Sequence, residues 1–207
     1  MNYRYITIEG NIGAGKTTLA NKLAKHYNAK IILEEFAENP FLPKFYEKPQ
    51  QYAFPLELFF MAERYKQLKD LLQSQDMFRN LVVSDYLFIK SLLFAKINLK
   101  EEEYSLYQKL FEIINPQLMQ PDLLIFLNAP INKLQQNIKT RNRSYEQQIA
   151  DEYLVSVHEM YMQYIRQHPI RTLMVDMTKT DFLKNPGDFD LLLQALEKDY
   201  EPGIHYL

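Results

Sequence analysis

The chain contains no cysteine and no tryptophan among its 207 residues, and only five glycines. The absence of cysteine excludes a disulfide framework, a cysteine nucleophile and a thiolate metal site. It also leaves the chain indifferent to the redox state of its compartment, so the cytoplasm is the default expectation. A formal net charge of −2 gives no overall basic field, and we therefore expect no nucleic-acid partner.

Long hydrophobic runs are also missing. No apolar stretch approaches the roughly 20 residues that a membrane-spanning helix needs, so we expect no membrane contact. The first residues, Met1-Asn2-Tyr3-Arg4, lack the apolar core of a signal peptide. Hydrophobic residues make up 47% of the chain and aromatic residues 14%, which argues against disorder. The length predicts a single domain over residues 1–207.

Strand and helix patterns alternate along the whole chain. Short apolar runs predict strands at 5–9, 31–33, 81–83, 123–127 and 172–175. Apolar residues at helical spacing predict helices at 17–27, 49–74, 87–96, 101–114, 131–141, 148–166 and 188–198, and 39–43 is rich in turn residues. The order predicts an α/β fold with a five-stranded parallel sheet and helices on both faces. Functional sites of such sheets lie at the carboxyl ends of the strands.

Residues 10–17, Gly10-Asn11-Ile12-Gly13-Ala14-Gly15-Lys16-Thr17, fit the pattern G-x-x-x-x-G-K-[ST]. They follow a predicted strand and open a predicted helix, which is the context that a phosphate-binding loop requires. Glycines let backbone N–H groups surround phosphate oxygens, and the helix N-terminus adds donors and positive potential. Lys16 can reach the β- and γ-phosphates, and the Thr17 hydroxyl can bind Mg²⁺. The loop predicts binding of ATP or GTP.

A basic cluster late in the chain indicates which kind of nucleotide-binding protein this is. Lys139, Arg141 and Arg143 lie at and just after the end of the predicted helix 131–141, and no N-K-x-D motif of a guanine-reading switch is present. Phosphoryl transfer needs positive charge around the moving phosphate, which favours a kinase with a lid. Cations at the solvated end of a helix explain the cluster equally well.

Two pairs of polar residues are candidates for the acceptor side. Glu34 and Glu35 follow the second strand, where one of them can take the proton of an acceptor hydroxyl as general base. Glu57 and Arg64 lie on one face of the helix 49–74, with Met61 between them, and can read the edge of a base. The alternatives are solvated carboxylates at a strand end and a salt-bridged surface face.

Three further segments carry recognisable sequence patterns. The first, 45–57, contains Phe45-Tyr46-Glu47-Lys48-Pro49 and Tyr52-Ala53-Phe54-Pro55-Leu56-Glu57. The second is Arg141-Asn142-Arg143-Ser144-Tyr145-Glu146-Gln147, and the third is Asp151-Glu152-Tyr153-Leu154. They resemble the substrate pocket, the lid and the following helix of the deoxynucleoside kinases. Residues 8–16 resemble that family's phosphate loop, in which Gly-Asn-Ile is distinctive. The similarity covers nearly the whole chain and points to the bacterial purine-directed branch.

The resemblance implies a P-loop kinase fold with a lid at about 141–147. It also implies ATP-dependent phosphorylation of the 5′-hydroxyl of a deoxynucleoside, purine preferred, in nucleotide salvage. Mg²⁺ with ATP would be the cofactor, ATP and the deoxynucleoside the partners, and a helix-paired homodimer the assembly. One alternative is a nucleoside monophosphate kinase like thymidylate kinase, which would need a further basic site. The other is a degenerate nucleotide-binding protein that regulates a partner.

The resemblance also implies roles for individual residues. The general base would be Glu34, or Glu35 as second choice, and Lys16, Arg141 and Arg143 would complete the catalytic set. The expected ATP-binding residues are Gly10, Asn11, Ile12, Gly13, Ala14, Gly15, Lys16, Thr17, Thr18, Arg141, Arg143, Lys179, Thr180, Asp181 and Phe182. The expected substrate-binding residues are Glu34, Phe36, Leu42, Phe45, Tyr46, Leu56, Glu57, Met61, Arg64, Asp85, Tyr86, Lys90 and Glu146. Thr17 and Asp85 would hold the metal.

Two positions depart from the family pattern. Tyr86 stands where the family usually has an arginine that orients the base and the 5′-hydroxyl, and Lys90, one turn further along, is a candidate substitute. Glu57 stands where the family often has glutamine. A carboxylate offers only acceptors, which suits the N1–H and N2–H donors of guanine. We therefore expect deoxyguanosine to be handled at least as well as deoxyadenosine.

Overall fold

A computed structural model describes residues 2–35, 39–73 and 81–207. The strands in this part of the chain are β1 (Tyr5–Gly10), β2 (Lys30–Ile32), β3 (Val82–Ser84), β4 (Leu123–Asn128), β5 (Arg171–Asp176) and β6 (Gly203–Tyr206). They form one sheet in the order β2-β3-β1-β4-β5-β6, and every neighbouring pair is parallel. The parallel α/β architecture is confirmed.

The sixth strand corrects the prediction of five. β6 pairs with β5, with Ile204 opposite Thr172. Its residues are half-buried or exposed, and Ile204 is its only aliphatic residue, between Gly203 and His205. An edge strand that buries so little has no apolar run for the sequence pattern to reveal.

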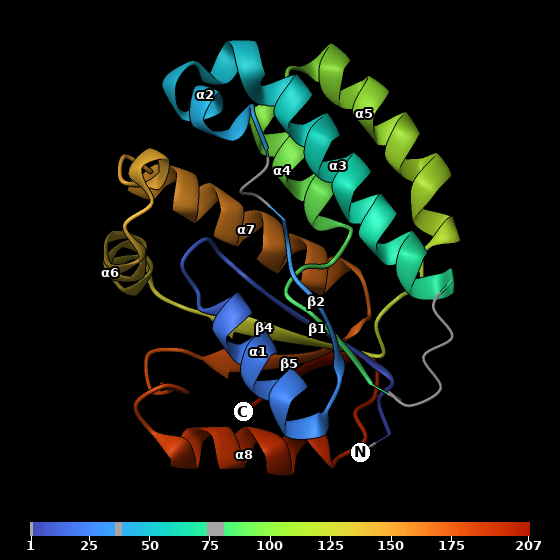
Figure 1. The fold of residues 1–207 in the computed structure, drawn as a ribbon, viewed down its shortest axis with the longest axis vertical. Coiled ribbons are helices and arrows are strands. Elements are labelled where there is room, and N and C mark those ends of the chain that lie inside the picture. Colours follow the sequence, from blue (N-terminus) through green and yellow to red (C-terminus); the bar gives the residue numbers. More distant parts are fainter. Residues whose placement is uncertain (1, 36–38, 74–80) are drawn as a thin grey trace.

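The helices are α1 (Lys16–Tyr27), α2 (Leu42–Glu47), α3 (Pro49–Gln73), α4 (Lys90–Asn98), α5 (Glu101–Ile114), α6 (Ile131–Arg141), α7 (Asp151–Gln167) and α8 (Pro186–Leu196). Figure 1 shows α1 and α8 on one side of the sheet and α3, α4, α5 and α7 on the other. The expected turn-rich segment 39–43 contains a turn at residues 40–41 and leads into the short helix α2, which was not predicted, and α7 begins at 151 rather than 148. None of the described helices is both long and apolar enough to cross a bilayer.

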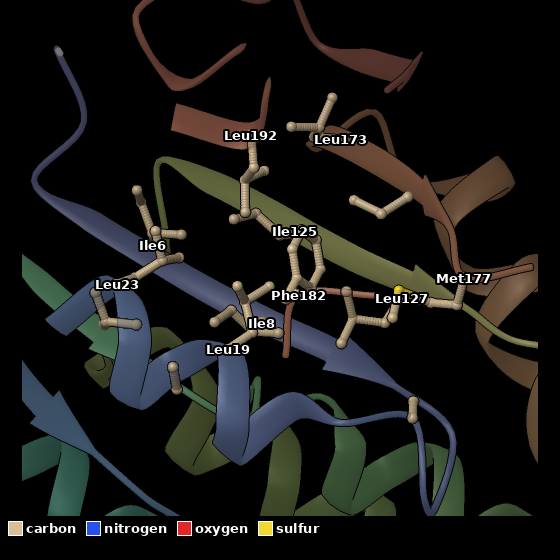
Figure 2. Close-up of a cluster of buried hydrophobic side chains, with 14 of the residues drawn as sticks. Ile6, Ile8, Leu19, Leu23, Ile125, Leu127, Leu173, Met177, Phe182 and Leu192 are labelled. Carbon is tan, nitrogen blue, oxygen red and sulfur yellow. The ribbon is translucent and has the colours of Figure 1, made fainter. Parts of the chain in front are cut away.

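Alternation along the central strands explains why helices cover both faces. Ile6 and Ile8 of β1 lie with Ile125 and Leu127 of β4 against α1 (Figure 2). The intervening side chains of β4, Leu124 and Phe126, pack on Val157 and Tyr161 of α7 instead. Because successive side chains of a strand point to opposite faces, one apolar run supplies two cores. Each fully buried aliphatic side chain contributes about 1.5–3 kcal/mol.

The long helix α3 carries the acceptor side of the molecule. Its buried Met61 and Leu68 join a cluster with Phe88 and Phe111, against which Phe54, Leu58 and Tyr65 also pack. The predicted apolar stripe of this helix is therefore present from Phe54 to Leu68. The stripe fixes the rotation of α3, so that Glu57 and Arg64 face the cavity at the carboxyl ends of the strands.

Candidate active site

One cavity of about 1090 Å³ lies at the carboxyl ends of the parallel strands. Its walls come from the loop after β1, from Glu34 after β2, from Asp85 after β3, and from the segments that follow β4 and β5. This is the position expected for a site of a parallel α/β sheet. The cavity brings the phosphate loop, the two helices α3 and α4, and the lid segment together.

The phosphate loop depends on glycine backbone geometry. Gly13 and Gly15 have φ values of 81° and 95°, a region that other residues rarely adopt. A Cβ atom on Gly13 would also lie 2.8 Å from the carbonyl oxygen of Leu134, because α6 packs directly on the loop. Asn137 of α6 donates to the Gly13 carbonyl at 2.8 Å. The neighbouring helix therefore holds the loop in shape.

Not every loop residue faces the cavity. Residues 12–18 line it, whereas Asn11 is buried and its Nδ2 donates to the Leu154 carbonyl at 2.7 Å. Gly10 is buried as well, and its carbonyl accepts from Lys16 Nζ at 2.9 Å. The expected contacts of ATP with Gly10 and Asn11 thus fall on buried residues: Asn11 anchors the loop to α7, and Gly10 binds Lys16 within the loop.

Lys16 lies in an environment that weakens its charge. Burial and the nearby cation of Lys90 lower its pKa to about 8, although the carboxylates of Glu9, Glu34 and Asp85 act in the opposite direction. A polyanionic phosphate beside the ammonium group would favour its charged form. The loop therefore favours an anionic ligand electrostatically as well as sterically.

Glu34 is the centre of a buried ion-pair cluster. Its Oε1 accepts from Arg64 Nη2 at 2.5 Å and Nε at 3.0 Å, and its Oε2 accepts from Lys90 Nζ at 2.5 Å. Burial by itself would raise the pKa of Glu34, but Lys90 and Arg64 outweigh burial and hold it well below the usual range. The carboxylate is therefore ionised at neutral pH. Glu35, the second candidate for the base, is exposed and does not line the cavity.

Asp85 links the phosphate loop to the Glu34 segment. Its Oδ2 accepts from the Thr17 hydroxyl at 2.5 Å, and its Oδ1 accepts from the Glu34 backbone N–H at 2.7 Å. A hydroxyl and a carboxylate beside a phosphate loop are the hard oxygen donors that Mg²⁺ takes together with waters and phosphates. The described residues hold no group of three or more acidic, histidine or cysteine ligands. The donor set therefore fits a metal held jointly with a nucleotide.

Two expected substrate contacts lie in the core instead of the cavity. Tyr86 is fully buried and donates its hydroxyl to Gln67 Oε1 at 2.6 Å. Met61 packs in the same hydrophobic cluster. Lys90, by contrast, lines the cavity and pairs with Glu34. The departure at Tyr86 therefore leaves the position beside Glu34 to Lys90. Phe36, also an expected contact, lies outside the described residues.

The lid segment is held together by a carboxylate. Arg141 at the end of α6 and Arg143 both pair with Glu146, which is only 5% exposed, and the Arg143 Nη1 to Glu146 Oε1 distance is 3.1 Å. The Tyr46 and Tyr145 rings stack with centroids 6.0 Å apart. Arg141, Arg143, Glu146 and Tyr46 all line the cavity, as do Leu42, Phe45 and Leu56 from the predicted pocket segment.

The segment after β5 forms the far end of the cavity. Thr180, Asp181 and Phe182 line it, whereas the side chain of Lys179 is 86% exposed and does not. Phe182 also packs between the sheet and α8, beside Ile8 and Leu127 in Figure 2. Lys133 of α6 donates to carbonyl oxygens of Met177 and Thr180, and Lys22 of α1 donates to that of Phe182. These two lysines were missed in the sequence analysis, because their role of holding this segment depends on carbonyl oxygens that lie far away in the sequence.

Glu9 is a third missed residue. Its fully buried carboxylate accepts from the Leu87 N–H at 2.7 Å and from the Tyr161 hydroxyl at 2.8 Å, and burial raises its pKa. It ties β1 to the segment that enters α4 and to α7. The sequence did contain a signal for this role, namely a charged residue inside an apolar strand. Such a residue is buried only when it has hydrogen-bond or charge partners, so its position indicates a structural link.

Glu57 lies between the pocket segment and α4. Its side chain is 2% exposed and lines the cavity, and its Oε1 accepts from Asn98 Nδ2 at 2.7 Å. Burial raises its pKa to about 7, while the Asn98 hydrogen bond and Arg64 lower it. Asn98 and Tyr153 also line this end of the cavity and were not predicted as site residues: Asn98 belongs to no recognisable motif, and Tyr153 was assigned only to the helix that follows the lid.

Comparisons with known proteins agree with this geometry. The deoxynucleoside kinase family model matches residues 6–199. Deoxyguanosine kinase of Bacillus subtilis is 34% identical over 194 residues, covering 90% of this chain and 92% of the relative. Deoxyadenosine kinase of Dictyostelium discoideum is 30% identical, covering 95% of this chain and 79% of its own length. The structure of deoxyadenosine kinase from M. mycoides superimposes with a TM-score of 0.81 at 23% identity, covering 93% of this chain and 98% of that one. The chain belongs to the deoxynucleoside kinase family.

Proposed function

We propose that this deoxynucleoside kinase transfers the γ-phosphate of ATP to the 5′-hydroxyl of a deoxynucleoside, with purines preferred. The observation that carries the proposal is the Glu34 carboxylate, paired with Arg64 and Lys90, in the same cavity as the phosphate loop. The similar proteins named for deoxyguanosine and deoxyadenosine support the preference for a purine. The cavity, with a volume of about 1090 Å³, has room for both substrates. Its lining extends from the segment after β5, at the ATP end, to α4, at the nucleoside end.

Glu34 acts on the acceptor in this proposal. Because Lys90 and Arg64 keep it ionised, its carboxylate accepts a hydrogen bond from the 5′-hydroxyl and orients the oxygen toward the donor. A depressed pKa makes Glu34 a weak base. A weak base suffices because the transition state of phosphoryl transfer is loose, so the hydroxyl loses its proton late. Glu35 takes no part, since it lies outside the cavity.

The donor is held by the phosphate loop. Backbone N–H groups of residues 13–17 and the Lys16 ammonium surround the β- and γ-phosphates. Mg²⁺, held by Thr17 and Asp85 with the phosphates, supplies charge neutralisation when bound. Thr180, Asp181 and Phe182 cover the base of ATP, and Lys22 and Lys133 fix this segment through its carbonyl oxygens.

The segment 141–147 works as the lid. Arg141 and Arg143 share the Glu146 carboxylate, and a transferring phosphate would compete with it for their charge. Glu146 and Tyr46 then contact the sugar. Closure over the phosphate excludes water and suppresses hydrolysis. We propose that lid, loop and pocket belong to one domain, because all three line the same cavity.

The alternatives are less well supported. A nucleoside monophosphate kinase needs unengaged cations at the acceptor end, but Arg64 and Lys90 there are both committed to Glu34. A degenerate binding protein does not require the Thr17–Asp85 and Glu34–Lys90 pairs, which are assembled together in this cavity.

The test is transfer of phosphate from ATP with Mg²⁺ to each of the four deoxynucleosides, with guanosine and dTMP alongside. We expect transfer to deoxyguanosine and deoxyadenosine that is lost in Lys16→Ala. Lys25→Ala is the matched control, because Lys25 is exposed on the same helix. Transfer to dTMP alone would favour the monophosphate kinase.

The assembly and cellular role are part of the same proposal. Leu106 and Ile113 of α5 lie two turns apart and are 52% and 65% exposed, which supports pairing of two chains through this helix. Light scattering should give a dimer mass, and Leu106→Lys with Ile113→Lys should give the mass of the monomer. Use of ATP and a free deoxynucleoside supports a place in nucleotide salvage in the cytoplasm.

A further inference from the structure

We propose that Glu57 reads both purine bases at one position: it binds guanine as a carboxylate and adenine as a neutral carboxylic acid. The protonation of this single group would then set which purine deoxynucleoside is phosphorylated. The inference rests on the proposed function and deepens it, because it names how one pocket accepts two bases with different hydrogen-bonding edges.

Among the described residues, the geometry leaves Oε2 of Glu57 without any hydrogen-bond partner, while Oε1 keeps a second lone pair beside its bond to Asn98. Oε1 accepts from Asn98 Nδ2 at 2.7 Å, whereas Oε2 is buried and has no hydrogen-bond partner in the described part of the chain. Buried carboxylate oxygens are nearly always partnered, and an exception calls for an explanation. Since Glu57 lines the cavity beside Leu56, Phe60 and Tyr153, a base in this part of the cavity would supply the partner.

The two protonation states match two different base edges. Guanine presents two adjacent donors, N1–H and N2–H, and an ionised carboxylate accepts both. Adenine presents the acceptor N1 next to the N6–H donor, so a protonated Oε2 donates to N1 while Oε1 accepts from N6. Glutamine offers one donor and one acceptor, so it pairs with N1 and N6–H of adenine but cannot accept from both N1–H and N2–H of guanine. The proton comes from solvent, and no covalent step is involved.

The groups around Glu57 come from five elements. Arg64 lies on α3 itself, Asn98 and Lys90 on α4, Glu34 after β2, Tyr107 on α5 and Tyr153 on α7. The Tyr107 hydroxyl donates to the Glu57 backbone carbonyl at 3.2 Å.

The charges in this group act on the pKa of Glu57 in both directions: Arg64 and Lys90 lower it, and Glu34 raises it. Arg64 and Lys90 are both paired with Glu34, so neither cation is committed to Glu57. Burial raises the pKa values of Tyr107 and Tyr153, which keeps both neutral at the relevant pH. Burial is then the largest influence on Glu57 and brings its pKa to about 7, where both protonation states are populated.

The sign of the pH dependence follows. Raising the pH increases the ionised fraction of Glu57, which favours deoxyguanosine, and lowering it favours deoxyadenosine. The ratio of the two kcat/KM values should rise with pH, by up to about tenfold per unit. Groups that act on both reactions, such as Lys16, cancel in this ratio. Neither free base changes its own protonation between about pH 6 and about pH 8.

The experiment measures kcat/KM for deoxyguanosine and deoxyadenosine across about pH 6 to about pH 8. We expect the guanine-to-adenine ratio of the unmodified chain to rise at least about tenfold. In Glu57→Gln the ratio should be independent of pH and shifted toward adenine. Glu63→Gln is the matched control, because this half-buried residue of the same helix does not line the cavity, and it should behave like the unmodified chain. Asn98→Ala removes a hydrogen bond to the carboxylate and should move the rise to higher pH.

Proton linkage on binding gives a readout without turnover. In calorimetry near pH 7 with two buffers of different ionisation enthalpy, deoxyguanosine should release protons and deoxyadenosine should take them up. A flat ratio in the unmodified chain, or the same slope in Glu57→Gln, overturns the inference while leaving the kinase assignment intact. No transfer to either purine at any pH overturns the proposed function instead, and opposite proton linkage would still support the role of Glu57.

Discussion

The donor and acceptor ends of the cavity are built from different materials. The donor end consists mainly of backbone: a glycine loop with positive φ angles and the N-terminus of α1. The acceptor end consists of buried charged side chains on α3 and α4, with Glu34, Arg64 and Lys90 in direct contact. Backbone N–H donors bind an anion without burying a charged side chain. The acceptor cluster, in contrast, is stable only while Glu34, Arg64 and Lys90 are all present, because removing one leaves a buried charge without its partner. Substitutions at the two ends should therefore differ in their effect on stability.

The largest effect is expected at Glu34. Glu34→Gln leaves Arg64 and Lys90 buried without a carboxylate, and should cost about 3–5 kcal/mol of unfolding free energy. The same change removes the group that orients the acceptor and should lower kcat by about 10²–10⁴-fold. Kinetics and urea unfolding measure both effects. Glu35→Gln, next to it but exposed, is the matched control and should change neither; the opposite ranking would make Glu35 the base.

Lys16 should separate activity from stability. Lys16→Ala removes the ammonium group at the phosphates and should lower kcat/KM by about 10²–10³-fold. Because burial already disfavours the charged lysine, the unfolding free energy should stay the same or increase. A loss of stability as large as that of Glu34→Gln would remove the distinction between the two ends.

Lys90 tests what replaces the arginine expected at Tyr86. Lys90→Met should raise the pKa of Glu34, since the lysine is the largest influence that lowers it. The acid limb of the kcat/KM profile should move to higher pH, with about a tenfold loss of rate at neutral pH. Lys96→Met, an exposed position on the same helix, should leave the limb unchanged. An unshifted limb in Lys90→Met would remove the lysine from this role.

Stability in acid provides a further test of the acceptor cluster. The pKa of Glu34 is lower in the folded chain than in the unfolded chain, so its pairing stabilises the fold above the ordinary glutamate range. This contribution is lost as the pH falls through the folded pKa. Unfolding free energies measured from neutral pH into acid should fall less steeply in Glu34→Gln, because the variant has no such contribution to lose.

A smaller loss of stability than at Glu34 is expected at Gly13 of the phosphate loop. Gly13→Ala places a side chain at φ 81° and within 2.8 Å of the Leu134 carbonyl, so the loop and α6 must separate slightly. We expect a loss of about 1–3 kcal/mol together with weaker ATP binding, measured by thermal unfolding and calorimetry. Gly187→Ala is the control and should change little. Gly187 does not have a positive φ, and a Cβ atom there would lie no closer than 3.4 Å to any described atom beyond its chain neighbours and its own helix backbone.

The same contrast explains what could be predicted from the sequence. A loop made of backbone requires specific residues in consecutive positions, so residues 10–17 identified the donor end. The acceptor cluster draws single residues from α3, α4 and the end of β2, and only the fold shows that Glu34 contacts Lys90. Lys133, Lys22 and Asn98 were missed for this reason, because each binds a partner distant in sequence.

Failures at single positions have equally physical causes. Tyr86 was placed at the substrate because it stands where the family usually has an arginine, but the chain turns after β3 and buries the ring against α3. β6 was missed because an edge strand with one aliphatic side chain has no pattern to read. The helix patterns succeeded where a continuous apolar stripe is present, as in α3.

The central claim is that the two ends act on two substrates in one reaction. The most direct measurement titrates the chain separately with ATP and with deoxyguanosine by calorimetry, and then follows formation of the 5′-monophosphate under the same conditions. We predict that both ligands bind and that transfer occurs, and is lost in Lys16→Ala. Binding of both ligands without transfer by the unmodified chain would contradict the account and indicate a nucleotide-binding protein without kinase activity.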